Sequence, residues 1–223
     1  MPGCFVASPA TASRPSAMTS PRTVPLLLIR HGATAWTAEG RYQGRQDTAL
    51  STQGRADANR LALHLRDADI GLVVSSPLAR ARETAALIAD AARAPLQLDE
   101  RLVELDFGQW EGLTQPQIKA LWPQDLRNWK QANANARPPG GESMEELQRR
   151  VEDFLRAPWA SEGRAIAIVA HAWVVRVATL CLNGQSLARA RDLAVPPASI
   201  HLARLAVSAT CTPPHETSLQ ASP

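Results

Sequence analysis

Residues 26–36 read LLLIRHGATAW, and this stretch decides the fold. A run of four apolar residues leads directly into Arg30, His31 and Gly32. A short apolar run that ends in turn residues is typical of a strand buried on both faces, and the carboxyl ends of such strands form the ligand-binding edge of a parallel sheet. Arginine suits phosphate, histidine can act as nucleophile, acid or base, and glycine lets backbone approach a ligand closely. A solvated histidine in a polar turn fits the triplet equally well, so the rest of the chain must decide.

The composition fits one sizeable globular domain. The chain has 223 residues, of which 45% are hydrophobic and 20% are charged. Its net charge of +3 comes from scattered basic residues, which argues against a nucleic-acid or membrane-surface partner. No apolar run is long enough to span a membrane. Cys4, Cys181 and Cys211 lie far apart, which argues against a disulfide framework or a zinc site and favours a reducing, cytoplasmic location.

Both ends of the chain differ in composition from the middle. Residues 1–24 are rich in Pro, Ser, Ala and Thr, and we expect a disordered tail there, with Met18 as an alternative start. Residues 208–223 are polar and predict a loose C-terminal tail. The expected domain therefore spans residues 25–207.

Within that domain, the hydrophobic pattern alternates between strands and helices. Buried strands are expected at 26–30, 71–75 and 165–170, a short strand at 96–98 and an edge strand at 199–207. Apolar residues recur at helical spacing between them, with Ser51 and Ser143 as N-caps and Pro77 at the start of one helix. This alternation predicts a mainly parallel sheet that is covered by helices on both faces.

Each of the three buried strands is followed by groups that bind or transfer phosphate. Arg30 and His31 follow the first strand, Arg80 lies one turn into the helix after the second, and His171 follows the third. Because the carboxyl ends of parallel strands meet at one edge, these four side chains should form a cationic pocket. Such a pocket, with a histidine nucleophile and an acid for the leaving group, suits a phosphate monoester.

A carboxyl group for that pocket stands in the segment ELDFG. Glu104 and Asp106 alternate in an extended segment and point the same way, so geometry alone does not choose between them. Taken singly, each candidate also fits an ordinary role, such as a surface arginine for Arg80, a solvated carboxylate for Glu104 or a core histidine for His171.

Six blocks of sequence together resemble a known family. LLLIRHGATAW, GRYQG, SSPLARARETA, LVELDFGQWEG, PGGES and VAHAWVVR occur in the order found in the histidine phosphatases, the phosphoglycerate mutase-like superfamily. The resemblance spans about residues 25–205, and within the superfamily the chain looks most like small bacterial phosphatases, including α-ribazole phosphatase. It implies a three-layer α/β/α sandwich with a mainly parallel sheet.

The resemblance also implies a role for each polar group. His31 would be the nucleophile that carries a phosphohistidine intermediate, while Arg30, Arg80 and His171 would hold the phosphoryl group. Glu104 matches the general acid of the family by its spacing from the Phe-Gly pair that follows it. The positions that line the phosphate correspond to Thr37, Gln43, Gly44 and the backbone amide of Ala172. No metal and no cofactor are implied.

Around this pocket the sequence departs from the family pattern. Ala33 replaces a glutamate, Thr37 stands where asparagine is common, and Ala172 and Trp173 replace a pair of glycines. No charged catalytic group is lost, so we expect an active enzyme in which Trp173 shapes the pocket and the departures concern the substrate.

Residues 111–141 are expected to form a lid-like insertion of short helices and a loop beside the pocket. In one interpretation, Trp110 or Trp129 together with Arg127 contacts the substrate beyond its phosphate. In the other, Trp122 and Trp129 pack the insertion against the sheet, since aromatic residues at helical spacing usually bury area.

The predicted function is that of a metal-independent phosphomonoesterase acting on a small phosphorylated metabolite, with α-ribazole 5′-phosphate as a candidate. Phosphoglycerate mutase-type transfer is disfavoured because the stretch after Glu104 is short and its basic residues do not follow the mutase pattern: Lys119, Arg127, Lys130 and Arg137. A catalytically silent member of the superfamily and a nucleic-acid-binding domain are further alternatives, disfavoured by the intact charged set and by the lack of a basic-aromatic patch. The sequence does not indicate an oligomeric state.

Overall fold

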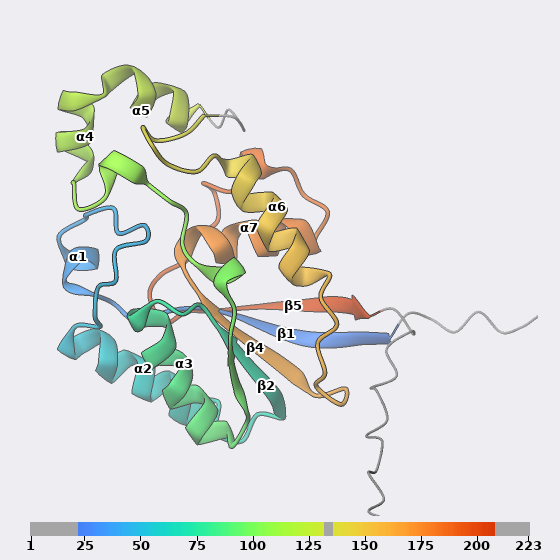
Figure 1. Ribbon diagram of the computed structural model, residues 1–223. Coiled ribbons are helices and arrows are strands. Elements are labelled where there is room, and N and C mark those ends of the chain that lie inside the picture. Colours follow the sequence, from blue (N-terminus) through green and yellow to red (C-terminus); the bar gives the residue numbers. More distant parts are fainter. Residues whose placement is uncertain (1–21, 132–135, 208–223) are drawn as a thin grey trace, which may run out of the picture.

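A five-stranded sheet forms the centre of the molecule (Figure 1), and the computed structural model describes residues 22–131 and 136–207. The strand order is β3-β2-β4-β1-β5, in which β5 alone runs antiparallel to its neighbour. The strands are β1 (Arg22–Arg30), β2 (Ile70–Ser75), β3 (Leu96–Leu98), β4 (Ala165–Ala170) and β5 (Ile200–Val207). The mainly parallel sheet and the edge position of β5 are as the hydrophobic pattern predicts, whereas the antiparallel direction of β5 is a finding of the structure.

Helices cover both faces of this sheet, which confirms the three-layer α/β/α sandwich. On one face lie α2 (Thr52–His64) and α3 (Ala79–Ala92), and on the other α6 (Met144–Leu155) and α7 (Ala172–Leu182), as Figure 1 shows. Successive residues of β1 alternate between the layers, because strand side chains point to opposite faces. Leu28 packs in the core beneath α6 and α7, while Ile29 packs against α2 and α3.

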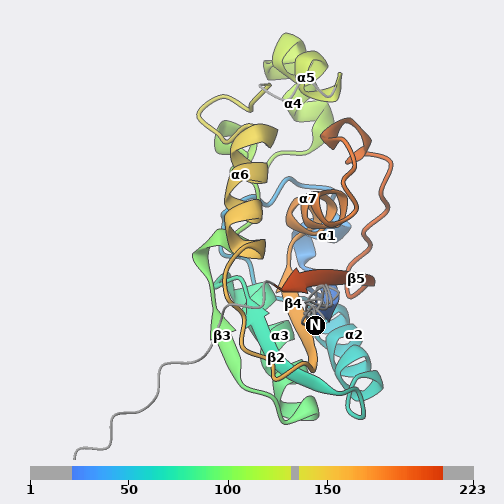
Figure 2. The ribbon, with the colours of Figure 1, turned by 90° about the vertical axis from the view of Figure 1, so that its right-hand side faces the viewer.

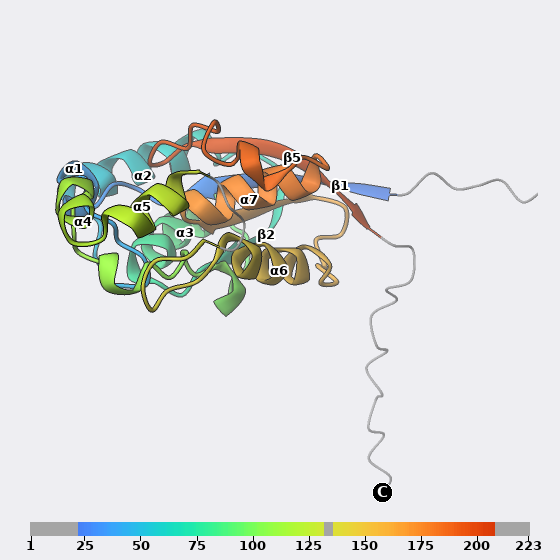
Figure 3. The ribbon, with the colours of Figure 1, turned by 90° about the horizontal axis from the view of Figure 1, so that it is seen from above.

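Shorter elements gather at the end of the molecule to which the parallel strands run (Figure 3). They are α1 (Ala35–Ala38), α4 (Gln115–Leu121) and α5 (Pro123–Lys130). Figures 1 and 2 both show α4 and α5 together, on the side away from α2 and α3. Three turns of 3₁₀ helix complete the described elements: η1 (Glu100–Leu102), η2 (Gly108–Trp110) and η3 (Leu187–Arg189).

The helix starts agree with the sequence in two cases and differ in a third. The Ser51 hydroxyl accepts the Gly54 amide at 3.0 Å, and Ser143 forms a reciprocal capping box with Glu146. The third helix, α3, begins at Ala79, two residues after the expected Pro77. Its first amide donates to the Asp47 carboxylate at 2.6 Å, so a distant loop supplies the cap that local sequence does not.

The ends of the domain also differ slightly from the expectation. Because β1 pairs with β5 from Arg22 onward, residues 22–24 belong to the sheet and not to the expected tail. The rest of the two predicted tails, 1–21 and 208–223, and positions 132–135 of the insertion lie outside the described residues. None of the described helices is both long and apolar enough to cross a membrane.

Candidate active site

Three neighbouring strands deliver the predicted polar groups to one place. β1 ends before His31, β4 ends before His171 and β2 ends before Ser76, and these strands are hydrogen-bonded side by side in the order β2-β4-β1. The ring centroids of His31 and His171 lie only 5.1 Å apart. The topology therefore brings together residues that are separated by 140 positions in the sequence.

His31 is buried, and its hydrogen bonds identify the tautomer. Its Nδ1 lies 2.6 Å from the carbonyl oxygen of Gly32, so Nδ1 carries the proton and donates it. Nε2 keeps its lone pair and accepts the Nε–H of Arg80 at 3.3 Å. Burial lowers the pKa of His31 well below its ordinary value, and the charges of Arg80 and Arg30 lower it further. The ring is therefore neutral at pH 7 and offers a nucleophilic nitrogen to a ligand between the arginines.

The glycine of the triplet has a different role from the one expected. A Cβ on Gly32 would lie 2.4 Å from the carbonyl oxygen of Gly54, and a Cβ on Gly54 would lie 1.9 Å from that of Ala33. Both glycines are needed because the first turn of α2 packs directly on the backbone after β1. Gly32 thus serves helix packing, while its neighbours Arg30 and His31 form the pocket.

Two arginines supply the positive charge of the pocket. Arg80 is fully buried, and its guanidinium donates to the carbonyl oxygens of Gln46 and Gly44 at 2.6 and 2.7 Å. Arg30 donates to the Val195 carbonyl at 2.6 Å, and its buried Nε has no partner among the described residues. Across the described part of the chain, neither arginine forms an ion pair within 4.0 Å. One buried and one partly buried cation that lack a bonded carboxylate are suited to binding an anion.

His171 lies beside His31 as a second buried, neutral imidazole. Its Nε2 lies 2.8 Å from the Ser76 hydroxyl, and its Nδ1 is buried without a partner among the residues described. Burial lowers the pKa of His171 well below its ordinary value, with a smaller contribution from the charge of Arg80. The Ser76 hydroxyl also accepts the Leu78 amide. Nδ1 is therefore the ring nitrogen of His171 that remains available to a ligand.

Glu104 is the carboxyl group of the pocket. It is 6% exposed, and its oxygens accept the amides of Leu105 at 3.0 Å and of Trp173 at 3.3 Å. Burial raises the pKa of Glu104 above its ordinary value, although these amides and the charges of Arg80 and Arg30 oppose the rise. A carboxyl group with a raised pKa can deliver a proton near neutral pH.

Asp106, the alternative carboxyl group, is engaged elsewhere. One of its oxygens accepts the Gly108 amide at 2.8 Å, and the other lies 3.5 Å from the guanidinium of Arg45. Its side chain is more exposed than that of Glu104, at 29%. The two carboxylates, which the sequence could not separate by geometry, therefore differ in both burial and partners, and Asp106 stabilises the turn that follows Glu104.

Sequence reasoning assigned no role to the pair that supports this turn. Arg150 of α6 binds both carboxylate oxygens of Glu142 at 2.7 and 2.9 Å, and it donates to the carbonyl oxygen of Glu104 at 3.1 Å. The Glu142 carboxylate also accepts the Asp106 amide at 3.3 Å. Glu142 is part of the PGGES block, and this motif was the one signal in the sequence that pointed to a role for Glu142.

Of the residues expected to line the phosphate, Gly44 contacts Arg80 directly and Gln43 is connected to it through Thr48. Gln43 bonds to Thr37, Thr34 and Thr48, so the Thr37 hydroxyl is held in a polar network beside the pocket. Gly44, at a positive φ of 52°, presents its carbonyl oxygen to Arg80. Ala172 is the first residue of α7, so its amide has no partner within the helix.

The tryptophans of the insertion are part of the hydrophobic core. Trp110 and Trp129 are 0% and 1% exposed and stack edge-on at 6.2 Å, while Phe107 and Trp173 extend the same aromatic cluster. Arg127 is exposed and donates to Gln124 of its own helix. These positions favour the packing interpretation of the insertion over substrate contact by Trp110, Trp129 or Arg127.

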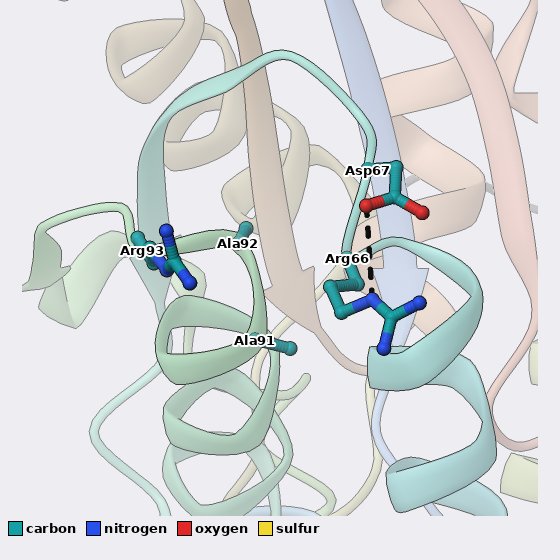
Figure 4. Close-up of a pocket in the computed structure, with 5 residues that line it drawn as sticks. All are labelled: Arg66, Asp67, Ala91, Ala92 and Arg93. Carbon is teal, nitrogen blue, oxygen red and sulfur yellow. Dashed lines mark ion pairs between the residues drawn. The ribbon is translucent and has the colours of Figure 1, made fainter.

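In the described ranges, no group of three or more His, Cys, Asp or Glu side chains is placed to hold a metal ion. A cavity of about 510 Å³ lies where α2 and α3 end, lined by Arg66, Asp67 and residues 91–93 (Figure 4). It opens at the amino ends of the strands and contains none of the groups described above.

Comparison with known proteins agrees with this geometry. The family model described as the histidine phosphatase superfamily (branch 1) matches residues 26–209. The chain belongs to this superfamily. It is therefore a histidine phosphatase-type enzyme, with phosphatase or mutase activity on small phosphorylated metabolites.

Relatives of this histidine phosphatase are named as phosphatases of different phosphate esters. Phosphoserine phosphatase 1 of Hydrogenobacter thermophilus is 32% identical over 170 residues, which cover 74% of this chain and 79% of the relative. The glucosyl-3-phosphoglycerate phosphatase of Mycolicibacterium vanbaalenii is 34% identical over 167 residues, or 71% and 74% of the two chains. The crystal structure of the α-ribazole phosphatase from Shigella flexneri superposes with a TM-score of 0.74 at 28% identity, covering 80% of this chain and 89% of that one.

Proposed function

We propose that this histidine phosphatase is a metal-independent phosphomonoesterase that transfers a phosphoryl group first to His31 Nε2 and then to water. One observation carries the proposal: the unprotonated Nε2 of His31 accepts from Arg80 in a pocket where Glu104 is the only buried carboxyl group among the residues that the structure describes. A nucleophile, cations and an acid are the groups that an in-line displacement at phosphorus needs.

In the first step, His31 Nε2 attacks phosphorus, and the N–P bond forms as the ester P–O bond breaks. Glu104 gives its proton to the leaving oxygen, which departs as an alcohol. In the second step, the Glu104 carboxylate takes a proton from water as the water oxygen attacks phosphorus. The N–P bond breaks, inorganic phosphate leaves, and both His31 and Glu104 return to their initial states.

Arg30, Arg80 and His171 act on the phosphoryl oxygens throughout. Their free N–H groups stabilise negative charge that spreads over those oxygens as the bonds change. Since two buried guanidinium groups supply the positive charge, we propose that the enzyme needs no metal ion. Thr37, Gln43, Gly44 and the Ala172 amide would complete the wall around the phosphate, partly by orienting Arg80.

The substrate belongs to the small phosphate monoesters. α-Ribazole 5′-phosphate is one candidate, supported by the likeness to the Shigella flexneri enzyme. Phosphoserine and phosphoglycerate-type esters are others, in view of the relatives' names. We place the reaction in the cytoplasm, because the three cysteines are too widely spaced to suggest a disulfide framework.

A trapping experiment tests the proposal directly. Enzyme quenched during turnover of p-nitrophenyl phosphate should carry an acid-labile, base-stable phosphoryl group, located on His31 by mass spectrometry. His64→Ala, which removes an exposed histidine of α2, serves as the matched control and should still be phosphorylated. Turnover should persist in EDTA and be inhibited by vanadate. Complete loss on chelation that magnesium or zinc restores would overturn the proposed mechanism.

A further inference from the structure

Two more arginines, Arg176 and Arg191, stand beside this pocket without a carboxylate partner in the part of the chain that the structure describes. The guanidinium carbon of Arg176 lies 4.8 Å from the ring centroid of Trp173, and that of Arg191 lies 5.0 Å from the rings of both Trp173 and Trp129. Each guanidinium has one bond to a carbonyl oxygen, from Arg176 to Leu193 at 3.0 Å and from Arg191 to Trp129 at 2.5 Å. The Nε of Arg191 is buried without a partner among the described residues. Most of their donors therefore remain for a ligand.

These arginines lie on the Glu104 side of the pocket. Trp173 connects the two places, because its amide donates to the Glu104 carboxyl group while its ring carries both guanidinium groups. Arg176 follows Trp173 by one turn of α7 and His171 by five residues, about 7.5 Å along the helix axis. A small leaving group whose oxygen is protonated by Glu104 would extend toward them.

The charges of the region support the same conclusion. Arg30, Arg80, Arg176 and Arg191 form a continuous cationic array, and burial together with the charge of Arg176 lowers the pKa of both Arg30 and Arg191. The charges of Glu104, Asp47 and Glu111 all act on Arg80, whereas Glu104 is the only carboxyl group of the described residues that acts on Arg30 or Arg176, and the proposed mechanism protonates it. A phosphate dianion held by Arg30 and Arg80 leaves Arg176 and Arg191, for which the described residues supply no ion pair within 4.0 Å. Uncompensated, partly buried cations cost free energy that a second anion would recover.

We propose that Arg176 and Arg191, on the platform of Trp173, bind a second oxyanion of the substrate. The inference rests on the proposed function and narrows it: the substrate is a small phosphate monoester whose leaving group carries a carboxylate or another phosphate. Planar guanidinium groups that are held on an aromatic face bind such oxyanions bidentately. A glycine at position 173 could not supply this platform. α-Ribazole 5′-phosphate, which carries no second oxyanion, is a poor ligand on this view.

Ligand binding to the His31→Ala variant tests the inference without turnover. Isothermal titration calorimetry would compare glycerol 3-phosphate with 3-phosphoglycerate, which replaces a hydroxymethyl group by a carboxylate. Propane-1,3-diyl bisphosphate adds the second-phosphate arm. We expect 3-phosphoglycerate or the bisphosphate, or both, to bind about 10- to 100-fold more tightly than glycerol 3-phosphate. The tighter of the two identifies the oxyanion, and equal affinity of all three overturns the inference.

Variants then assign the preference to the two arginines. Arg176→Gln and Arg191→Gln, each in the His31→Ala background, should reduce the preference about tenfold, and the lysine substitutions should retain part of it. Arg189→Gln removes the same charge from an exposed position of the same segment and should leave the preference unchanged. If Arg176 and Arg191 only hold the neighbouring loop and α5, the preference in their variants will match that of Arg189→Gln. This result overturns the inference.

The outcomes separate this inference from the proposed function. Phosphohistidine formation in the wild type without any ligand preference would leave the phosphatase proposal standing and remove the second oxyanion site. A clear preference without turnover of any ester would support the oxyanion site and overturn the phosphatase proposal.

Discussion

Two arginines near Glu104 are largely shielded from solvent and both bind backbone carbonyl oxygens, yet only one of them binds a carboxylate. Arg150 donates two hydrogen bonds to the Glu142 carboxylate. It also donates to two backbone carbonyl oxygens. Arg80, in the pocket, has only carbonyl oxygens, a threonine hydroxyl and the lone pair of His31 as partners. One guanidinium is balanced within the protein, and the other is left for a ligand.

The difference shows how charge distinguishes structural from functional parts of this fold. A buried ion pair with complete hydrogen bonding contributes to a single arrangement of the chain, whereas an unbalanced buried cation opposes folding and persists where function requires it. We therefore expect substitutions in the pocket to lower activity with little loss of stability. Substitutions in the support beneath it should lower stability first.

The largest effect is expected for His31→Ala. Removal of the nucleophile should reduce turnover of p-nitrophenyl phosphate by about 10⁴-fold or more, the scale of other nucleophile deletions. Because no ion pair is lost, the midpoint of urea unfolding should stay near that of the wild type. A His31→Ala variant with a rate close to that of the wild type would show that the pocket around Arg80 is not the catalytic site.

Glu104→Gln should have a smaller effect that depends on the leaving group. With a poor leaving group such as an alkyl alcohol, the rate should fall about 10²- to 10⁴-fold, the usual contribution of general acid catalysis. With nitrophenolate, which needs little protonation, the loss should be smaller. Asp106→Asn serves as the control, because that carboxylate is bound to Gly108 and Arg45. If Asp106→Asn alone shows the leaving-group dependence, the assignment of the acid is wrong.

The dependence of kcat/KM on pH tests the protonation states of the two catalytic groups. Activity requires neutral His31, whose pKa is lowered by burial, and protonated Glu104, whose pKa is raised by burial. For a poor leaving group, kcat/KM should therefore rise with pH through the pKa of His31 and fall with pH through that of Glu104. Glu104→Gln should abolish the fall on the alkaline side. If kcat/KM of Glu104→Gln still falls on the alkaline side, the fall is caused by a group other than Glu104.

The smallest effect on chemistry, and the largest on stability, is expected for Glu142→Gln. Loss of the carboxylate leaves Arg150 without its counter-charge in a partly buried site, which should lower the free energy of unfolding by about 1–3 kcal/mol. Urea unfolding measures this change, with Glu145→Gln on the exposed side of α6 as the control. The rate per folded molecule should fall less than in Glu104→Gln. Loss of activity without loss of stability would show that Glu142 belongs to the pocket.

The succession of strands along the chain and the convergence of the pocket residues could be predicted from the sequence in part. The apolar runs before Arg30 and His171 located β1 and β4, and their lengths matched buried parallel strands. The β–α alternation implied that their carboxyl ends share an edge, and the strand order agrees. Helix capping by Ser51 and Ser143 was equally local, because a cap involves residues only three positions apart.

Other features required contacts between distant segments. The start of α3 depends on Asp47, which lies 32 residues before the amide that it caps. The need for glycine at position 32 comes from the close approach of Gly54, and no local pattern reports such an approach. The helical spacing of Trp122 and Trp129 favoured burial, and Trp129 is buried, but its contact with Trp173 of α7 comes from the tertiary packing of the insertion.

By itself, the sequence determined the succession of strands and helices and the kinds of chemical group at each strand end, because periodicity and residue type are local properties of the chain. Only the tertiary structure decided between Glu104 and Asp106 as the buried carboxyl group, and left Arg176 and Arg191 without a carboxylate partner beside Trp173. Burial and charge balance are sums over neighbours from many parts of the chain. These sums set the pKa of a carboxyl group and the charge that a ligand must supply.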